Sequence, residues 1–133
     1  GANWVELNIK KFLGQEGVEA NKLILAMPFY TRLWRESNGT LTSSVVNMRS
    51  VTIPEGVEKT WDEETKQYYI EYEQNGSTYK MWIEDEESLK AKLDLVNQYE
   101  LAGGAFWSKD RESNTVWSVI AEKLGAKTDN TNE

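Results

Sequence analysis

The sequence predicts a mixed α/β fold, and two short apolar segments are the main reason. Residues 23–30 (LILAMPFY) and 101–107 (LAGGAFW) each consist of apolar residues that run into an aromatic side chain. Both are too short for an ordinary helix and are apolar on both faces, as buried parallel strands are. Helix-like sequence flanks each segment, so we expect neighbouring parallel strands of an α/β barrel. A complete barrel has eight strands in about 250 residues, so we expect this chain to be the closing portion of a larger barrel.

The first part of the chain is expected to be a helix followed by the first of these strands. Residues 4–13 place apolar side chains at spacings of three and four, which is typical of an amphipathic helix, and Gly14 ends it. After a short linker, residues 23–29 form the predicted buried strand, which Pro28 terminates. A helix followed by a strand is the order in which an α/β barrel repeats its elements.

The middle of the chain predicts a small α+β block. Residues 37–39 (SNG) mark a turn, and Ser43 or Ser44 is expected to cap a short helix over residues 45–51. Residues 74–77 (QNGS) predict a hairpin, because the Asn-Gly pair tolerates positive φ angles. The strand-like stretches around this hairpin are residues 57–61, 67–73 and 78–84.

The last part of the chain predicts helix, strand and helix. Acidic residues open the first helix, over residues 86–99, at the end where the helix dipole favours them. The strand of residues 101–107 follows, and a helix over residues 114–124 ends at a C-cap, Gly125. We therefore divide the chain into three parts. A barrel fragment covers residues 1–41 and 85–125, an inserted α+β block covers residues 42–84, and a polar tail covers residues 126–133.

The composition excludes several kinds of partner and cofactor. The chain has 22 acidic and 15 basic residues and no basic stripe, so nucleic acid is not an expected partner. No run of about 18 apolar residues is present, so no membrane-spanning helix is expected. Without Cys or His, disulfides and the usual zinc sites and His-based triads are excluded. No loop spaces carboxylates for a hard cation, so no metal or other cofactor is expected.

Aromatic residues are abundant for an acidic chain of this size. The 133 residues include six Trp and six Tyr. Flat rings that stack on the apolar faces of sugars would account for this number, and so would an ordinary aromatic core. Composition alone leaves the two interpretations open.

Three motifs, in order, resemble one enzyme family. Residues 22–32 (KLILAMPFYTR) are similar to hydrophobic residues followed by Gly-x-Pro-x-Tyr-Gly-Arg, and residues 101–107 are similar to the strand that follows it in that family. Residues 82–85 (WIED), with Ser88 and Lys92, are similar to the segment between the two. The chain thus resembles the C-terminal part of the chitinase-like glycoside hydrolases of family 18. Its acidic, Tyr-rich insertion looks most like the bacterial branch that acts on peptidoglycan or spore cortex.

The resemblance implies a fold, a substrate and a location. The fold would be the C-terminal portion of a TIM (β/α)8 barrel, containing its seventh and eighth strands and an inserted small α+β subdomain. Ala26 and Thr31 depart from the pattern, because the family often has Gly at these positions. The substrate would be a polysaccharide containing N-acetylglucosamine, in a protein that is secreted or lies in the cell envelope or spore. The family's Asp-x-x-Asp-x-Asp-x-Glu signature does not occur here, so no catalytic residue is assigned and this chain alone is expected to be inactive.

The resemblance also implies five substrate-binding residues, each with an alternative. Trp107 would form the floor under a sugar, or be a core residue at a strand end. Arg32 would bind sugar oxygens or pair with an acid, and Tyr30 would be a groove wall or a core residue. Trp34 would add a stacking surface, and Glu84 would bind a hydroxyl or serve a structural role. Asp85, adjacent to Glu84, is expected to cap the following helix.

Two other functions and one physical property remain as expectations. A non-catalytic glycan-binding module would suit the aromatic content equally well, and in a structural domain the same aromatics would simply be core. Two barrel strands without their outer neighbours would leave open strand edges and apolar flanks. Self-association of the chain is therefore expected.

Overall fold

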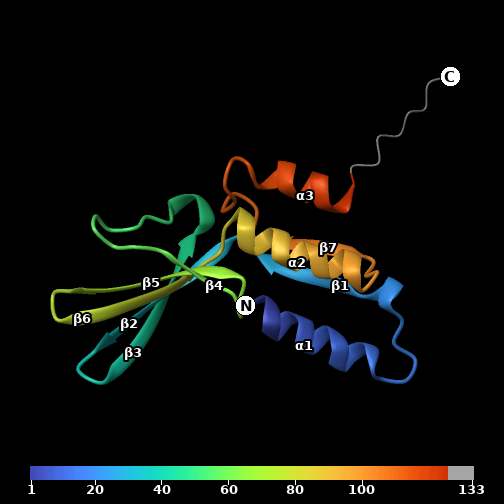
Figure 1. Ribbon diagram of the computed structural model, residues 1–133, viewed down its shortest axis with the longest axis horizontal. Helices are drawn as coiled ribbons and strands as arrows, with labels where there is room; N and C mark the ends of the chain where they lie inside the picture. The colour runs from blue at the N-terminus through green and yellow to red at the C-terminus, as the bar shows by residue number, and fades with distance from the viewer. Residues whose placement is uncertain (126–133) are drawn as a thin grey trace.

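The fold consists of two sheets and three helices, shown in Figure 1 as a computed structural model in which residues 1–125 are described. The predicted tail of residues 126–133 lies outside the described residues. The helices are α1 (Ala2–Leu13), α2 (Glu86–Gln98) and α3 (Val116–Leu124), and the strands are β1 (Ile24–Pro28), β2 (Tyr30–Ser37), β3 (Thr40–Asn47), β4 (Thr60–Asp62), β5 (Gln67–Gln74), β6 (Ser77–Ile83) and β7 (Gly103–Trp107). Figure 1 shows the five-stranded sheet on one side and the helices with the two-stranded sheet on the other.

The two apolar segments pair as parallel strands, as predicted. β1 and β7 form a two-stranded sheet whose register runs from Ile24 opposite Gly103 to Pro28 opposite Trp107. Gly104 allows Met27 to pack against the strand, because a Cβ atom at this position would lie 2.7 Å from the methyl carbon of Met27. The carboxyl ends of both strands therefore lie side by side.

Helix α2 lies between α1 and α3 and packs against both β1 and β7 (Figure 1). Its Leu89 and Leu93 are fully buried in a core that also contains Met27, Phe29 and Val116. Burial of each leucine side chain contributes about 1.5–3 kcal/mol, so this core is the main stabilisation of the two-stranded sheet. The 86–99 prediction for α2 is confirmed to within one residue.

A hollow separates α1 from β1. It has a volume of about 310 Å³ and is lined almost entirely by apolar side chains, among them Leu25 and Leu101. Three large side chains at its border are well exposed: Trp4 by 66%, Phe12 by 52% and Ile24 by 65%. Patches of this kind are unusual on a monomer, so this flank is an apolar surface without a covering element in residues 1–125.

The second sheet is antiparallel, with strand order β3-β2-β6-β5-β4. Both predicted turns are confirmed. Asn38-Gly39 joins β2 to β3, and Asn75-Gly76 joins β5 to β6. All four turn residues have positive φ angles between 49° and 75°, which Asn and Gly adopt most easily.

The structure corrects the predicted helix of residues 45–51. β3 continues through Asn47, and only a single 3₁₀ turn follows, over Met48–Ser50. The run from Thr40 to Asn47 pairs with β2 along its whole length, and its β-branched residues suit a strand better than a helix. The expected strand over residues 57–61 is also shorter and later, since β4 covers only Thr60–Asp62.

The five-stranded sheet also starts earlier than the predicted division of the chain. Its first residue is Tyr30, and the boundary predicted between residues 41 and 42 falls inside β3. One face of the sheet is covered, because Ile70, Met81 and Ile83 form a small core on it. None of the helices in residues 1–125 has both the length and the apolar character needed to span a membrane.

Candidate functional site

Trp107 lies at the carboxyl end of the two-stranded sheet. Its side chain is 70% exposed, although its backbone is held firmly: Phe29 donates its N–H to the carbonyl oxygen of Trp107, and Pro28 lies opposite. The ring of the fully buried Phe29 stacks on that of Phe106, with centroids 5.5 Å apart and planes inclined by 11°. In the described residues the indole of Trp107 is therefore exposed at the strand end, beside the stacked rings of Phe29 and Phe106.

Three further predicted site residues share one face of β2. Successive side chains of a strand point to opposite faces, so Tyr30, Arg32 and Trp34 lie on the same side. Tyr30 and Trp34 are half-buried and Arg32 is exposed. The guanidinium of Arg32 donates to the hydroxyl of Ser43 on β3 at 3.0 Å, a neutral partner that leaves its other N–H groups for a ligand.

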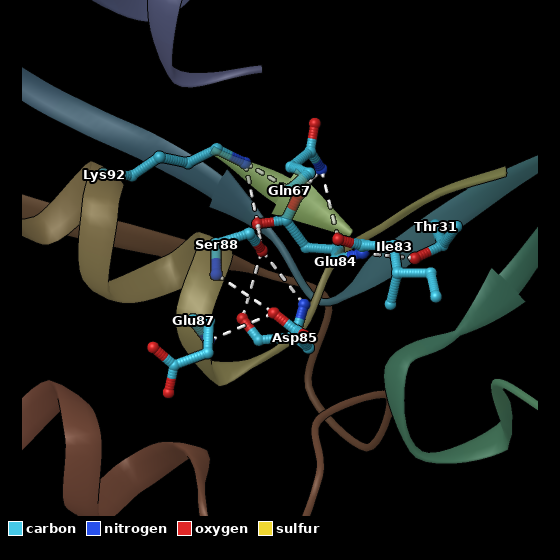
Figure 2. A network of polar contacts seen from close by, with 8 residues as sticks. All are labelled: Thr31, Gln67, Ile83, Glu84, Asp85, Glu87, Ser88 and Lys92. Carbon is cyan, nitrogen blue, oxygen red and sulfur yellow. Dashed lines mark hydrogen bonds and ion pairs between the residues drawn. The ribbon is translucent and has the colours of Figure 1, made fainter. Parts of the chain in front are cut away.

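Glu84 is placed differently from the other predicted site residues. It is only 4% exposed, and both carboxylate oxygens accept from Lys92 at 2.7 Å (Figure 2). Ser88 donates to one of these oxygens at 2.9 Å and Gln67 to the other at 3.1 Å. The structure therefore corrects the expectation of a groove contact, since Glu84 has no free acceptor directed to the surface. Its spacing of four and eight residues from Ser88 and Lys92 was the signal for this structural role.

This buried ion pair joins the five-stranded sheet to helix α2. Figure 2 shows Glu84 where the chain leaves β6 and enters α2. Its backbone N–H donates to the hydroxyl of Thr31 in β2 at 2.7 Å, while its side chain binds α2 and β5. The network consequently fixes the angle between the five-stranded sheet and the helix that supports β1 and β7.

Asp85 caps α2, as the sequence predicts. One of its carboxylate oxygens accepts from the backbone N–H groups of Glu87 and Ser88, both at 3.0 Å. The hydroxyl of Ser88 accepts from the backbone N–H of Asp85 at 3.0 Å, which completes a capping box. Partial burial raises the pKa of the Asp85 carboxyl, and the two backbone hydrogen bonds oppose that shift.

Sequence reasoning missed Trp82. Trp82 lies on β6 and is 37% exposed. Trp34 pairs with Lys80, and Trp82 is two residues after Lys80 on the same strand, so the side chains of Trp34 and Trp82 lie on the same face of the sheet. A hollow of about 300 Å³ lies on this face. Its lining residues are Trp34, Glu36, Leu41, Thr78, Lys80 and Trp82. Its place beside Trp34 follows from the pairing of β2 with β6, which no local sequence motif indicates.

Trp82 is held in place from two sides. Its ring packs against Tyr69 on β5, with centroids 4.7 Å apart. Its indole N–H lies 3.4 Å from a carboxylate oxygen of Asp62 on β4. The pKa of Asp62 is lowered from its usual value, chiefly by the hydrogen bond from the backbone N–H of Thr65, with a further contribution from Trp82. At neutral pH the ionised Asp62 therefore orients the indole.

Comparison with known families decides the assignment. The model for "Glycosyl hydrolases family 18" matches residues 3–112, which include β1, β7 and the whole five-stranded sheet. The chain belongs to glycosyl hydrolase family 18. The sequence-based recognition of this family is thereby confirmed.

The chain is also similar to individual curated proteins and solved structures. A curated relative, "Uncharacterized glycosylase YvbX" of Bacillus subtilis, is 22% identical over 89% of this chain and 35% of its own length. A chitinase structure from Chromobacterium violaceum matches 96% of the chain and 40% of its own, with 22% identity and a TM-score of 0.79.

Two more solved structures extend the comparison. A family 18 N-acetylglucosaminidase from Paenibacillus barengoltzii is 25% identical, with a TM-score of 0.69 over 90% of this chain and 38% of its own. The spore cortex-lytic enzyme SleL of Bacillus megaterium is 19% identical, with a TM-score of 0.63 over 80% and 26% respectively. The chain thus spans about two-fifths or less of the length of these relatives.

Proposed function

We propose that this chain supplies the seventh and eighth strands and one groove wall of a larger family 18 glycosidase with a TIM barrel. Its membership of the family and the parallel pairing of β1 with β7 support this proposal. The sheet of β2 to β6 follows the carboxyl end of β1, the end at which such barrels hold their active sites. It would therefore form the wall of the groove.

The observation that carries the functional proposal is the exposed indole of Trp107 at the carboxyl end of β7. A ring at this position provides a flat apolar surface under a sugar, and such stacking contributes about 1 kcal/mol beyond the burial of area. Arg32 would donate to sugar or N-acetyl oxygens, while Tyr30 and Trp34 would line the wall. These residues bind and orient the substrate and transfer no proton.

The proposed substrate is a polysaccharide containing N-acetylglucosamine, either chitin-like or peptidoglycan. Relatives named as a chitinase, an N-acetylglucosaminidase and a spore cortex-lytic enzyme support this substrate class. Polymers of this kind lie outside the cytoplasmic membrane, so the proposed location is secreted, in the cell envelope or in the spore.

The chemistry itself would need residues that this sequence does not contain. In the family's scheme, a Glu protonates the glycosidic oxygen while the N-acetyl group of the substrate attacks the anomeric carbon. The acidic signature that carries this Glu is absent from the 133 residues, so we propose that the chain alone binds glycan without cleaving it.

The test is a Trp107→Ala substitution in a longer protein that contains the acidic signature. We expect weaker binding of chitooligosaccharides and slower hydrolysis, because the indole platform is lost. Trp61→Ala is the matched control, because Trp61 is exposed on the opposite face of the five-stranded sheet. Unchanged binding and turnover in Trp107→Ala would overturn the assignment.

A non-catalytic glycan-binding module is the second candidate, favoured by the abundant aromatic residues of the chain. It makes the same prediction for binding and the opposite one for hydrolysis. A longer protein that binds chitooligosaccharide through Trp107 and never releases shorter products would establish this candidate in place of the enzyme.

A further inference from the structure

Beside the strand ends, the exposed face of the five-stranded sheet carries a second aromatic surface. Trp34 and Trp82 come from the neighbouring strands β2 and β6, and Lys80 lies between them in the pairing register. Diagonal neighbours of this kind are about 7–8 Å apart, which places two indole rings around one hollow. The remaining lining combines the exposed Leu41 with the polar Glu36 and Thr78.

The side chain of Trp82 on this surface is held in place by its neighbours. Tyr69 packs against the ring of Trp82, and Asp62 binds its N–H, so the indole does not need to be ordered by a ligand. Lys80 is directed toward Glu71, with 4.0 Å between ammonium and carboxylate, and Glu71 also accepts from the hydroxyl of Tyr69. A row of hydrogen-bonding groups therefore borders the aromatic rings.

The chemistry of the hollow selects a ligand class. Exposed rings with a polar border mark ligand grooves, and the rings offer flat apolar area while the border offers both donors and acceptors. A pyranose ring has the complementary arrangement, with C–H groups on its faces and hydroxyl groups around its edge. A nucleotide or another polyanion would meet Glu36 and Glu71, which disfavour it.

The position of the hollow extends the proposed groove. Tyr30, Arg32 and Trp34 follow one another on the same face of β2, at steps of about 6.5–7 Å, and Trp34 is the member that reaches the hollow. A polymer bound near the strand ends would reach Trp34 and Trp82 only if it is several sugars long.

We propose that Trp34 and Trp82 form a second glycan subsite on the outer sheet, which binds the distant part of a long N-acetylglucosamine polymer. This inference rests on the proposed function for its substrate class. It differs from that function in predicting a dependence on chain length, which the residues at the strand ends do not by themselves produce.

The test compares a hexamer with a dimer of N-acetylglucosamine, by calorimetric titration of this chain. We expect Trp82→Ala to weaken hexamer binding about tenfold, or about 1.4 kcal/mol, and to leave dimer binding unchanged. Trp61→Ala is the control, since Trp61 has nearly the same exposure, 36% against 37%, and also packs against a tyrosine, but on the other face of the sheet.

A second readout does not depend on the stability of the variant. In the unmodified chain, the indole N–H resonance of Trp82 should shift at a hexamer concentration at which the dimer leaves it fixed, because only the hexamer is also held at the strand ends. Equal effects of Trp82→Ala and Trp61→Ala, or an unmoved Trp82 resonance with bound hexamer, would overturn the second subsite. Failure of Trp107→Ala to affect either oligomer would instead overturn the role of Trp107 and leave the second subsite standing.

Discussion

Removing the cation of the buried ion pair should destabilise this chain more than any change to a surface charge. Lys92 and Glu84 have side chains that are only 7% and 5% exposed, at a separation of 2.7 Å. In Lys92→Met the Glu84 carboxylate keeps its hydrogen bonds from Ser88 and Gln67, but loses the opposite charge. Breaking such a pair from one side costs about 3–5 kcal/mol, a large share of the 5–15 kcal/mol by which domains are usually stable.

The measurement is urea unfolding followed by tryptophan fluorescence, with a double-mutant cycle of Lys92→Met and Glu84→Gln. Each single variant should lower the midpoint strongly, and the double variant should recover part of the loss because no unpaired charge remains. Lys90→Met is the matched control, since Lys90 belongs to the same helix and pairs with Glu87 at 2.9 Å in an exposed position. We expect almost no change from it.

Two results would contradict this expectation for the ion pair that joins the sheet to α2. The reasoning would be refuted if Lys92→Met lowered the midpoint no more than Lys90→Met. It would also be refuted if the two single variants added up in the double variant, since residues that form one buried pair must show a coupling energy.

Four other outcomes follow from the described contacts. Asp85→Ala should destabilise the chain by about 0.5–2 kcal/mol in urea unfolding, because the helix cap is lost. Asp85→Asn should keep most of the stability of the unmodified chain, because Asn also caps helices. Desolvation, together with the hydrogen bond to Glu71, raises the pKa of Tyr69 to about 12. The contribution of this tyrosine to stability should therefore be present below the unfolded pKa of about 10 and disappear as the pH rises through 12. In an ultraviolet titration, Glu71→Gln should let one tyrosine ionise at a lower pH than in the unmodified chain. Gly76→Ala should cost about 1–2 kcal/mol of unfolding free energy, because φ is 72° at this turn position. The open apolar flank between α1 and β1 should cause concentration-dependent self-association in sedimentation velocity, and a clean monomer at high concentration would contradict this expectation.

Local signals in the sequence were sufficient for the elements with strong short-range chemistry. The two Asn-Gly turns, the cap at Asp85 and the continuous apolar character of β1 each depend on neighbouring residues, and all were predicted correctly. The parallel pairing of β1 with β7 is a long-range feature, and the flanking helices identified it, because parallel strands need a crossover connection.

Long-range pairing decided the features that were missed. Residues 45–51 have few local signals, and the pairing of residues 45–47 with β2 overrides the serine caps that suggested a helix. Trp82 joins the surface of Trp34 only through the register of β2 with β6. The misassignment of Glu84 has a different cause: charged residues are usually exposed, and the local spacing to Ser88 and Lys92 in α2 that explains its burial was not used.

The hydrogen bond between Thr31 and Glu84 has a consequence for how the sheet tolerates change. The chain enters the five-stranded sheet at Tyr30 and leaves it at Glu84, and this bond closes the entrance against the exit at 2.7 Å. The sheet thus enters and leaves the rest of the fold at neighbouring points, and its hairpin turns lie away from this junction. Its hairpins can lengthen, shorten or exchange aromatic residues while the parallel strands and their helices keep their positions. The far end of the sheet is therefore the part of this fold in which a change of sequence disturbs the parallel strands least.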